Sequence, residues 1–127
     1  MRYFLIVLLA ALLIIVFVSC RSNGSSYTHI SQDEAARIMA EETGFVIVDV
    51  REPDEYAGGH IKGAINVPLS TIGDTQPAAL PDLEQRILVY CRSGVRSKNA
   101  SGKLSKIGYR NILEFGGIMT WKGEIVK

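Results

Sequence analysis

The chain has 127 residues, of which 47% are hydrophobic and 21% are charged, and its formal net charge at pH 7 is +1. About one hundred residues follow the N-terminal segment, which is enough for one domain with a hydrophobic core. The sequence shows no internal repeat. The near-neutral charge and the lack of a recognised binding motif argue against a nucleic-acid partner.

The N-terminus carries a pattern typical of export. Met1 and Arg2 are followed by residues 3–18, which contain no charged or strongly polar side chain. A short basic start and an apolar core are typical of a secretory signal. The segment ends in Phe17-Val18-Ser19-Cys20, which resembles the lipobox of bacterial lipoproteins, in which the cysteine is lipidated and becomes the new N-terminus. We therefore expect residues 1–20 to be a lipoprotein signal and Cys20 to carry lipid.

Two alternatives stay open for this segment: an uncleaved membrane anchor and ordinary secretion. As a helix, residues 3–19 would span about 25 Å, against about 30 Å for the hydrocarbon core of a bilayer. All three outcomes place the protein outside the cytoplasm, and lipidation predicts a membrane-anchored protein on the periplasmic or extracellular side of a bacterial membrane. Residues 21–27 are polar and contain Ser and Gly, which predicts a tether before a domain over residues 28–127.

Beyond the tether, helical and strand patterns alternate. Ser31 is a candidate N-cap, with Glu34 three residues on, for a helix that runs to about Glu42. A second long helix is predicted from Val95 to about Ile107, ended by Gly108, and shorter helices near residues 52–57 and 120. Residues 71–81 predict a loop or a broken helix. Four short runs rich in Ile and Val predict buried parallel strands: 46–50, 65–67, 87–90 and 112–115.

Cys91 follows the third apolar run and begins the turn Cys91-Arg92-Ser93-Gly94-Val95-Arg96-Ser97. A strand, a short Gly-containing turn and a helix start direct several backbone N–H groups at one spot. These amides and the two arginines favour the thiolate, which is the reactive form of cysteine. The alternative is a buried structural cysteine, but such a residue has no need of these polar and charged neighbours. The pattern therefore predicts a nucleophile.

Residues 91–96 resemble the active-site loop of the single-domain rhodaneses, the thiosulfate sulfurtransferases. Residues 46–56 and 59–68 resemble a second motif of that family, and residues 116–121 resemble its closing Gly-Gly and Trp signature, so the resemblance runs from about Ile30 to Gly123. Related cysteine phosphatases and arsenate reductases have one residue more between the loop cysteine and arginine. The tighter ring of amides suits a single terminal sulfur better than a tetrahedral oxyanion.

The resemblance implies an α/β, rhodanese-like fold with a central, mostly parallel sheet of about five strands and helices on both faces. It also implies that the Cys91 thiolate attacks the outer sulfur of an anionic donor such as thiosulfate and forms a persulfide. A thiol or cyanide then accepts that sulfur. This chemistry requires no metal and no organic cofactor. The backbone amides that stabilise the persulfide are expected from Arg92, Ser93, Gly94, Val95, Arg96 and Ser97.

Three further residues are candidates for supporting roles. Asp49 and Arg51 lie at the C-terminal end of the first predicted strand, which is the functional edge of a parallel sheet. The matching aspartate of rhodaneses organises the active-site loop, so we expect Asp49 to pair with Arg96, in a structural or an orienting role. We expect His60 to be a structural, hydrogen-bonded histidine rather than a proton shuttle. Trp121 is expected in the core or in a pocket wall.

The active-site helix is basic. Residues 87–113 contain six Lys or Arg and no Asp or Glu, which favours capture of an anionic substrate. If Cys20 carries lipid, Cys91 has no intramolecular partner and stays a free thiol. Two alternatives to the enzyme stay open: a rhodanese-like module that binds a partner protein or relays sulfur to or from it, and a thiol redox sensor.

Overall fold

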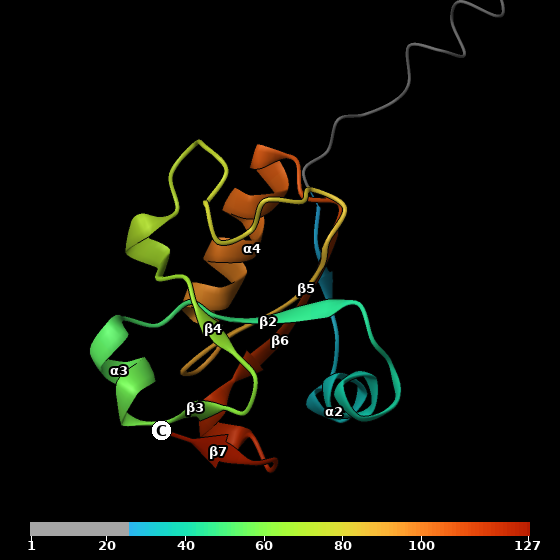
Figure 1. Cartoon of the computed structure of the whole chain (residues 1–127), viewed down its shortest axis with the longest axis vertical. Coiled ribbons are helices and arrows are strands. Elements are labelled where there is room, and N and C mark those ends of the chain that lie inside the picture. The colour runs from blue at the N-terminus through green and yellow to red at the C-terminus, as the bar shows by residue number, and fades with distance from the viewer. Residues whose placement is uncertain (1–25) are drawn as a thin grey trace, which may run out of the picture.

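The computed structural model describes residues 26–127, and Figure 1 shows the arrangement of their helices and strands. The predicted signal, Cys20 and most of the predicted tether lie outside the described residues. Within residues 26–127, no helix combines the length and the apolar character that crossing a membrane requires.

A five-stranded parallel sheet forms the centre of the domain, in the order β1-β6-β5-β2-β4, which confirms the predicted α/β architecture. The four predicted strands are all present, and the two-residue strand β1 was missed because it is too short to show an alternating pattern. The strands of this sheet are β1 (Thr28–His29), β2 (Phe45–Asp49), β4 (Ile65–Asn66), β5 (Arg86–Cys91) and β6 (Asn111–Gly117).

A second, antiparallel pair of strands joins two distant parts of the chain and was also missed. Strand β3 (His60–Ile61) pairs with β7 (Ile125–Val126) near the C-terminus. The other elements are α2 (Gln32–Glu41), α3 (Pro53–Gly58), α4 (Val95–Ile107) and the two single-turn helices η1 (Leu69–Thr71) and η2 (Ile118–Thr120).

The predicted ends of both long helices are confirmed. The Ser31 side chain accepts a hydrogen bond from the Glu34 N–H at 3.1 Å, which satisfies one free amide at the start of α2. Helix α4 ends at Gly108, whose φ of 125° is a conformation that a residue with a side chain rarely adopts.

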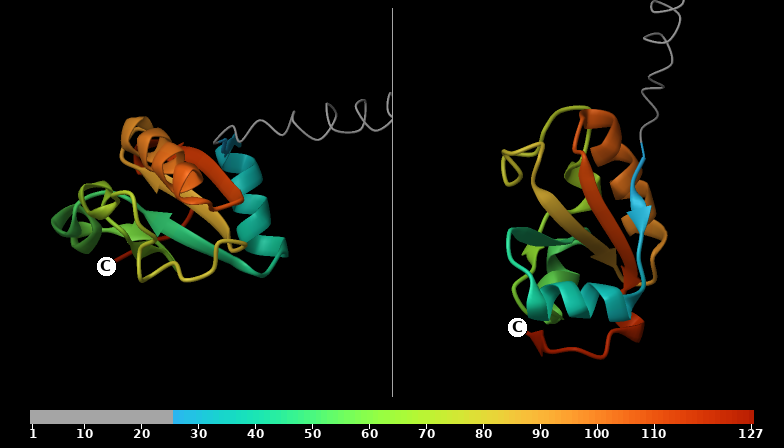
Figure 2. Two further views of the ribbon diagram at one scale, coloured as in Figure 1. Left: turned by 90° about the horizontal axis from the view of Figure 1, so that it is seen from above. Right: turned by 90° about the vertical axis from the view of Figure 1, so that its right-hand side faces the viewer.

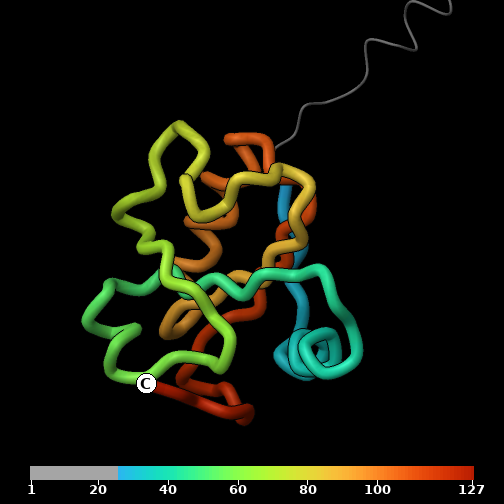
Figure 3. Tube along the Cα trace, in the orientation of Figure 1, coloured from blue at the N-terminus to red at the C-terminus, as the bar shows by residue number. Residues whose placement is uncertain are grey.

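Helices cover both faces of the sheet, with α4 on one face and α2 on the other (Figure 2). Side chains of β5 alternate between these faces: Val89 and Cys91 point toward α4, and Leu88 and Tyr90 point toward α2. The loop after η1 adds Ile72 and Leu80 to the α4 side of the core, and Figure 3 traces its path beside that helix. The alternation therefore places the Cys91 thiol between the sheet and the start of α4.

Candidate functional site

Cys91 is the last residue of β5, and the chain turns there directly into α4. Gly94, just before the helix, has φ 108° and ψ −11°, a left-handed conformation that glycine adopts without steric cost. This reversal brings the Gly94 N–H to 3.0 Å from Cys91 Sγ. The Ser97 Oγ lies 3.5 Å from the same sulfur. The loop therefore wraps its polar groups around the thiol, as the sequence pattern predicted.

These contacts change the acidity of the thiol. Burial by itself would raise the pKa of Cys91, because a low-polarity environment disfavours the charged form. Hydrogen bonds from the Ser97 side chain and from the backbone N–H groups of Ser97, Gly94 and Ser93 outweigh burial, so the pKa of Cys91 falls below its usual value. The site thus favours a thiolate.

The loop after Cys91 packs against the end of β6 and the residues that follow it. The Met119 N–H donates to the Arg92 carbonyl oxygen at 3.2 Å. At Gly117 the two backbone segments approach so closely that a Cβ atom there would lie 2.0 Å from the Arg92 oxygen. The closing glycine motif is therefore required for a direct backbone contact with the loop that follows Cys91.

The residues of the loop after Cys91 differ in their exposure to solvent. Arg92, Ser93 and Val95 are exposed, Arg96 is half-buried, and Gly94 and Ser97 are buried beneath them. The buried Gly94 and Ser97 contact the sulfur, and the exposed side chains of the loop face solvent.

Arg96 pairs with Glu55 of α3, which corrects the predicted pairing with Asp49. The two guanidinium nitrogens lie 2.7 and 2.9 Å from the two Glu55 oxygens. The prediction was wrong because side chains alternate along β2. Val48 and Val50 point toward α4, so Asp49 points to the opposite face of the sheet.

Replacing Glu55 with glutamine should remove a stabilisation that depends on pH. Hydrogen bonds from Arg96 and from the Glu52 N–H outweigh partial burial and lower the pKa of Glu55 to about 2. A carboxylate with a depressed pKa stabilises the fold above its unfolded pKa, about 4.3, and this contribution is lost as the pH falls toward 2. Urea unfolding should find Glu55→Gln about 1 kcal/mol less stable than wild type at pH 7, with the difference vanishing near pH 2. A difference that persists at pH 2 would contradict the assignment.

Asp49 instead forms a buried ion pair with Arg51. Its carboxylate accepts hydrogen bonds from the Arg51 backbone N–H at 2.9 Å and from the guanidinium at 2.7 to 3.1 Å. The Tyr90 hydroxyl donates to the same carboxylate at 2.7 Å, and Arg51 also donates to the Gly59 carbonyl at 2.7 Å. The network therefore connects β2, β5 and the end of α3 on the α2 face of the sheet.

Asp49→Asn is expected to destabilise the protein by about 3 kcal/mol, because it leaves the buried Arg51 charge without a counter-charge. Urea unfolding at pH 7 measures the change. The matched control is Glu124→Gln, which breaks an exposed pair with Lys62 and should cost less than about 1 kcal/mol. Equal losses in the two variants would show that burial of the Asp49 pair adds nothing.

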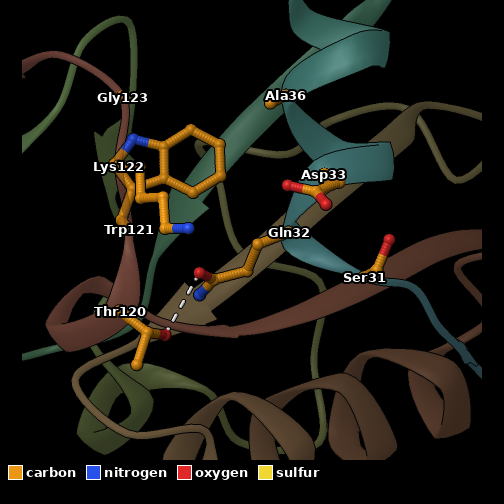
Figure 4. A pocket seen from close by; sticks show the side chains of 8 residues that line it. All are labelled: Ser31, Gln32, Asp33, Ala36, Thr120, Trp121, Lys122 and Gly123. Atoms are coloured by element: carbon orange, nitrogen blue, oxygen red, sulfur yellow. Dashed lines mark hydrogen bonds between the residues drawn. The ribbon is translucent and has the colours of Figure 1, made fainter.

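His60 and Trp121 lie away from the thiol in packing positions. The His60 Nδ1 is 2.9 Å from the Tyr56 carbonyl oxygen, and its ring stacks on the Tyr56 ring at 3.7 Å. Trp121 packs against Phe115 and forms one wall of an open groove of about 310 Å³ between the start of α2 and residues 120–123 (Figure 4). Within residues 26–127, no cluster of His, Cys, Asp and Glu has the geometry of a metal site.

Two acidic residues at the site were not predicted, although a feature of the sequence indicated each of them. Glu55 lies inside the motif at residues 46–56, at the third position of a short helix. Glu114 interrupts the apolar run 112–115 and is fully buried in β6. A charged residue inside a predicted buried strand needs a partner, and that requirement could have drawn attention to it.

Comparison with known proteins connects this geometry to a family. A model of the family described as "Rhodanese-like domain" matches residues 31–124. The thiosulfate sulfurtransferase PspE of Escherichia coli is 38% identical over 71 residues, covering 56% of this chain and 68% of that protein. The thiosulfate sulfurtransferase GlpE of Pseudomonas entomophila is 35% identical over 99 residues, covering 77% and 87%.

Other relatives are longer proteins that the chain matches only in part. It spans 65% of a putative mitochondrial thiosulfate sulfurtransferase of Schizosaccharomyces pombe, at 38% identity and over 63% of its own length. It spans 25% of a tRNA uridine(34) hydroxylase of Erwinia tasmaniensis, at 35% identity and over 65% of its own length.

Solved structures agree with the fold. A rhodanese-like domain protein from Staphylococcus aureus matches with a TM-score of 0.66 and 30% identity, covering 76% of this chain and 93% of that one. A rhodanese with anions from Escherichia coli matches with a TM-score of 0.58 and 36% identity, covering 65% and 96%.

Proposed function

Because the chain belongs to the rhodanese-like domain family, we propose that it is a sulfurtransferase that carries sulfane sulfur on Cys91 as a persulfide. One observation carries this proposal: Cys91 Sγ lies within hydrogen-bond distance of the Gly94 N–H, at 3.0 Å, in a loop held by direct backbone contact with β6. Amides that converge on a sulfur stabilise an anion there, whether it is a thiolate or the terminal sulfur of a persulfide.

The transfer proceeds in two steps. The Cys91 thiolate attacks the outer sulfur of thiosulfate or a similar anionic donor, the sulfur–sulfur bond of the donor breaks, and sulfite leaves with the bonding electron pair. Cys91 now carries a persulfide anion. A nucleophile, either a thiolate or cyanide, attacks the outer sulfur, and Cys91 leaves as a thiolate ready for another cycle.

The test is a mass measurement combined with an assay of turnover. Thiosulfate alone should add one sulfur atom to the purified protein, and the addition should map to the peptide that contains Cys91. Cyanide should then remove this sulfur as thiocyanate, and both reagents together should give continuous thiocyanate formation. Folded protein with a free thiol that gains no sulfur from thiosulfate would overturn the proposal for this donor.

A second candidate function, transfer of sulfur to or from a partner protein, is favoured by the surface around the loop. Val95 is 76% exposed and Met119 is 66% exposed, and the Met119 N–H bonds the loop at Arg92. Exposed apolar side chains beside a reactive thiol suit contact with another protein. A persulfide that forms with a persulfidated protein donor, but not with thiosulfate, would distinguish this relay from the small-molecule enzyme.

We further propose that the protein is exported and anchored to a membrane by lipid on Cys20. The support is the sequence of residues 1–20, with its apolar segment and the resemblance of residues 17–20 to a lipobox. Growth of a bacterial expression host with a labelled fatty acid should label the wild-type protein and not Cys20→Ser. Equal labelling of both proteins, or of neither, would contradict the lipid anchor.

A further inference from the structure

Glu114 is a fully buried acid for which the sulfur-transfer steps above provide no role. Its Oε1 accepts hydrogen bonds from the Ser97 hydroxyl at 2.7 Å and from the Gly116 N–H at 2.8 Å. Its Oε2 lies 2.5 Å from the Nδ1 of His29 on the neighbouring strand β1. Both carboxylate oxygens are thus engaged, one toward the active-site helix and one toward a titratable ring.

The Ser97 hydroxyl lies between Glu114 and the reactive sulfur. It is 2.7 Å from Glu114 Oε1 and 3.5 Å from Cys91 Sγ. A hydroxyl has one proton to donate, and the carbonyl oxygens of Gly94 at 3.0 Å and Gly116 at 3.4 Å are also acceptors within reach of Ser97. The Glu114 carboxylate is nearer than both and is charged when it is ionised, so Ser97 donates to it in preference and turns toward the sulfur when the carboxylate is protonated. The direction of this single hydrogen bond connects the protonation of Glu114 with that of Cys91.

His29 connects the buried acid to solvent. Its side chain is 60% exposed, whereas the Glu114 side chain is completely buried. An imidazole ring can both accept and donate a proton. An unbroken series of contacts therefore runs from solvent through His29, Glu114 and Ser97 to the Cys91 thiol.

We propose that His29 and Glu114 form a proton-exchanging pair that controls the ionisation of Cys91 through Ser97. The inference rests on the proposed role of Cys91 as the nucleophile. When Cys91 ionises, its S–H proton passes to Ser97 Oγ while the Ser97 hydroxyl proton passes to Glu114 Oε1. The pair then holds one additional proton, on Glu114 or on His29, and the reverse transfer restores the thiol.

Charge is the reason for the coupling. A carboxylate and a thiolate that contact the same hydroxyl repel each other, and one proton on the pair cancels that repulsion. At about 6 Å and an effective dielectric constant of about 20, one charge shifts a pKa by about one to two units. The Cys91 thiolate should therefore be more stable while the His29–Glu114 pair holds the additional proton.

Among the other charged groups near the thiol, Arg92 of the same loop is exposed to solvent, and Arg96, Asp49 and Arg51 have partners of their own. Arg96 attracts the Cys91 thiolate from α4, and Glu55 of α3 holds its guanidinium. Asp49 and Arg51 pair with each other on the opposite face of the sheet. Among the described residues, His29 is the titratable side chain in direct contact with Glu114.

The thiolate absorbance of Cys91 in the absence of any sulfur donor tests the proposal. It is measured against pH for wild type, His29→Gln, Glu114→Gln and the double variant, with Cys91→Ser as the blank. His29→Gln should raise the pKa of Cys91 by about one unit, because an uncompensated carboxylate remains behind Ser97. Glu114→Gln should leave this pKa at or below the wild-type value, and the double variant should match Glu114→Gln.

These readouts separate an electrostatic role from a structural one. His29 is exposed, so His29→Gln tests the proposal even if Glu114→Gln fails to fold. An unchanged Cys91 pKa in His29→Gln would overturn the proposal, as would an equal increase from His29→Gln in the Glu114→Gln background. The thiolate titration uses no sulfur transfer, so it gives a result even if the proposed activity fails.

Discussion

Replacing Cys91 with serine is expected to abolish sulfur transfer, with a loss of at least about a thousandfold in turnover. An oxygen nucleophile at this position cannot form the sulfur–sulfur bond of the persulfide, and a serine hydroxyl stays protonated at neutral pH. The fold should persist, because serine is slightly smaller than cysteine and the Gly94 N–H still has an acceptor at 91. Thiocyanate formation and the mass gained from thiosulfate measure the two effects.

Cys20→Ser is the matched control for Cys91→Ser, since it makes the same chemical change at the other cysteine of the chain. The purified control variant should transfer sulfur at the wild-type rate. Thermal unfolding of both variants checks that the domain is intact. Sulfur gained by folded Cys91→Ser, or turnover close to that of wild type, would refute the persulfide mechanism.

Gly117→Ala is expected to cost about 3 kcal/mol of stability and most of the activity. The added Cβ would lie 2.0 Å from the Arg92 oxygen and 2.6 Å from the Ser93 nitrogen. Both contacts are backbone atoms of the loop after Cys91, which cannot rotate away as a flexible side chain would. Relief of the clash must move the loop away from β6, and the amides around Cys91 move with it. Urea unfolding and the turnover assay measure the two losses.

Gly102→Ala is the matched control, because it makes the same substitution where there is space. A Cβ at Gly102 would meet no atom within 4 Å, and Gly102 lies inside α4. Alanine is the better helix former, so this variant should gain about 0.5 to 1 kcal/mol and keep its activity. If both variants were equally stable, the close approach at Gly117 would not determine the position of the loop.

Much of the domain could be predicted from short stretches of sequence. The apolar run before Cys91 and the glycine after it indicated a strand, a turn and a helix, and the structure has β5, Gly94 in a left-handed conformation and α4 in that order. The cap at Ser31 and the end at Gly108 were found for the same reason. Caps, turns and periodicity depend on residues within about one helical turn of each other, so the local sequence contains the information.

Pairings between distant residues could not be predicted in this way. Arg96 and Glu55 lie 41 positions apart, and His29 and Glu114 lie 85 positions apart. Asp49 was assigned the wrong partner because the prediction placed it at the correct edge of the sheet without considering which face its side chain takes. A strand shorter than three residues, such as β1 or β3, shows no period and forms only because another strand lies beside it.

The sequence by itself therefore determined the family, the candidate nucleophile Cys91 and the loop that surrounds it, because these depend on contiguous motifs. Only the tertiary structure decided which acid holds Arg96, where the Asp49 carboxylate points, and that a buried glutamate lies behind the Cys91 thiol. Those contacts arise when strands and helices from distant parts of the chain pack together, and their geometry depends on the register and face of each strand.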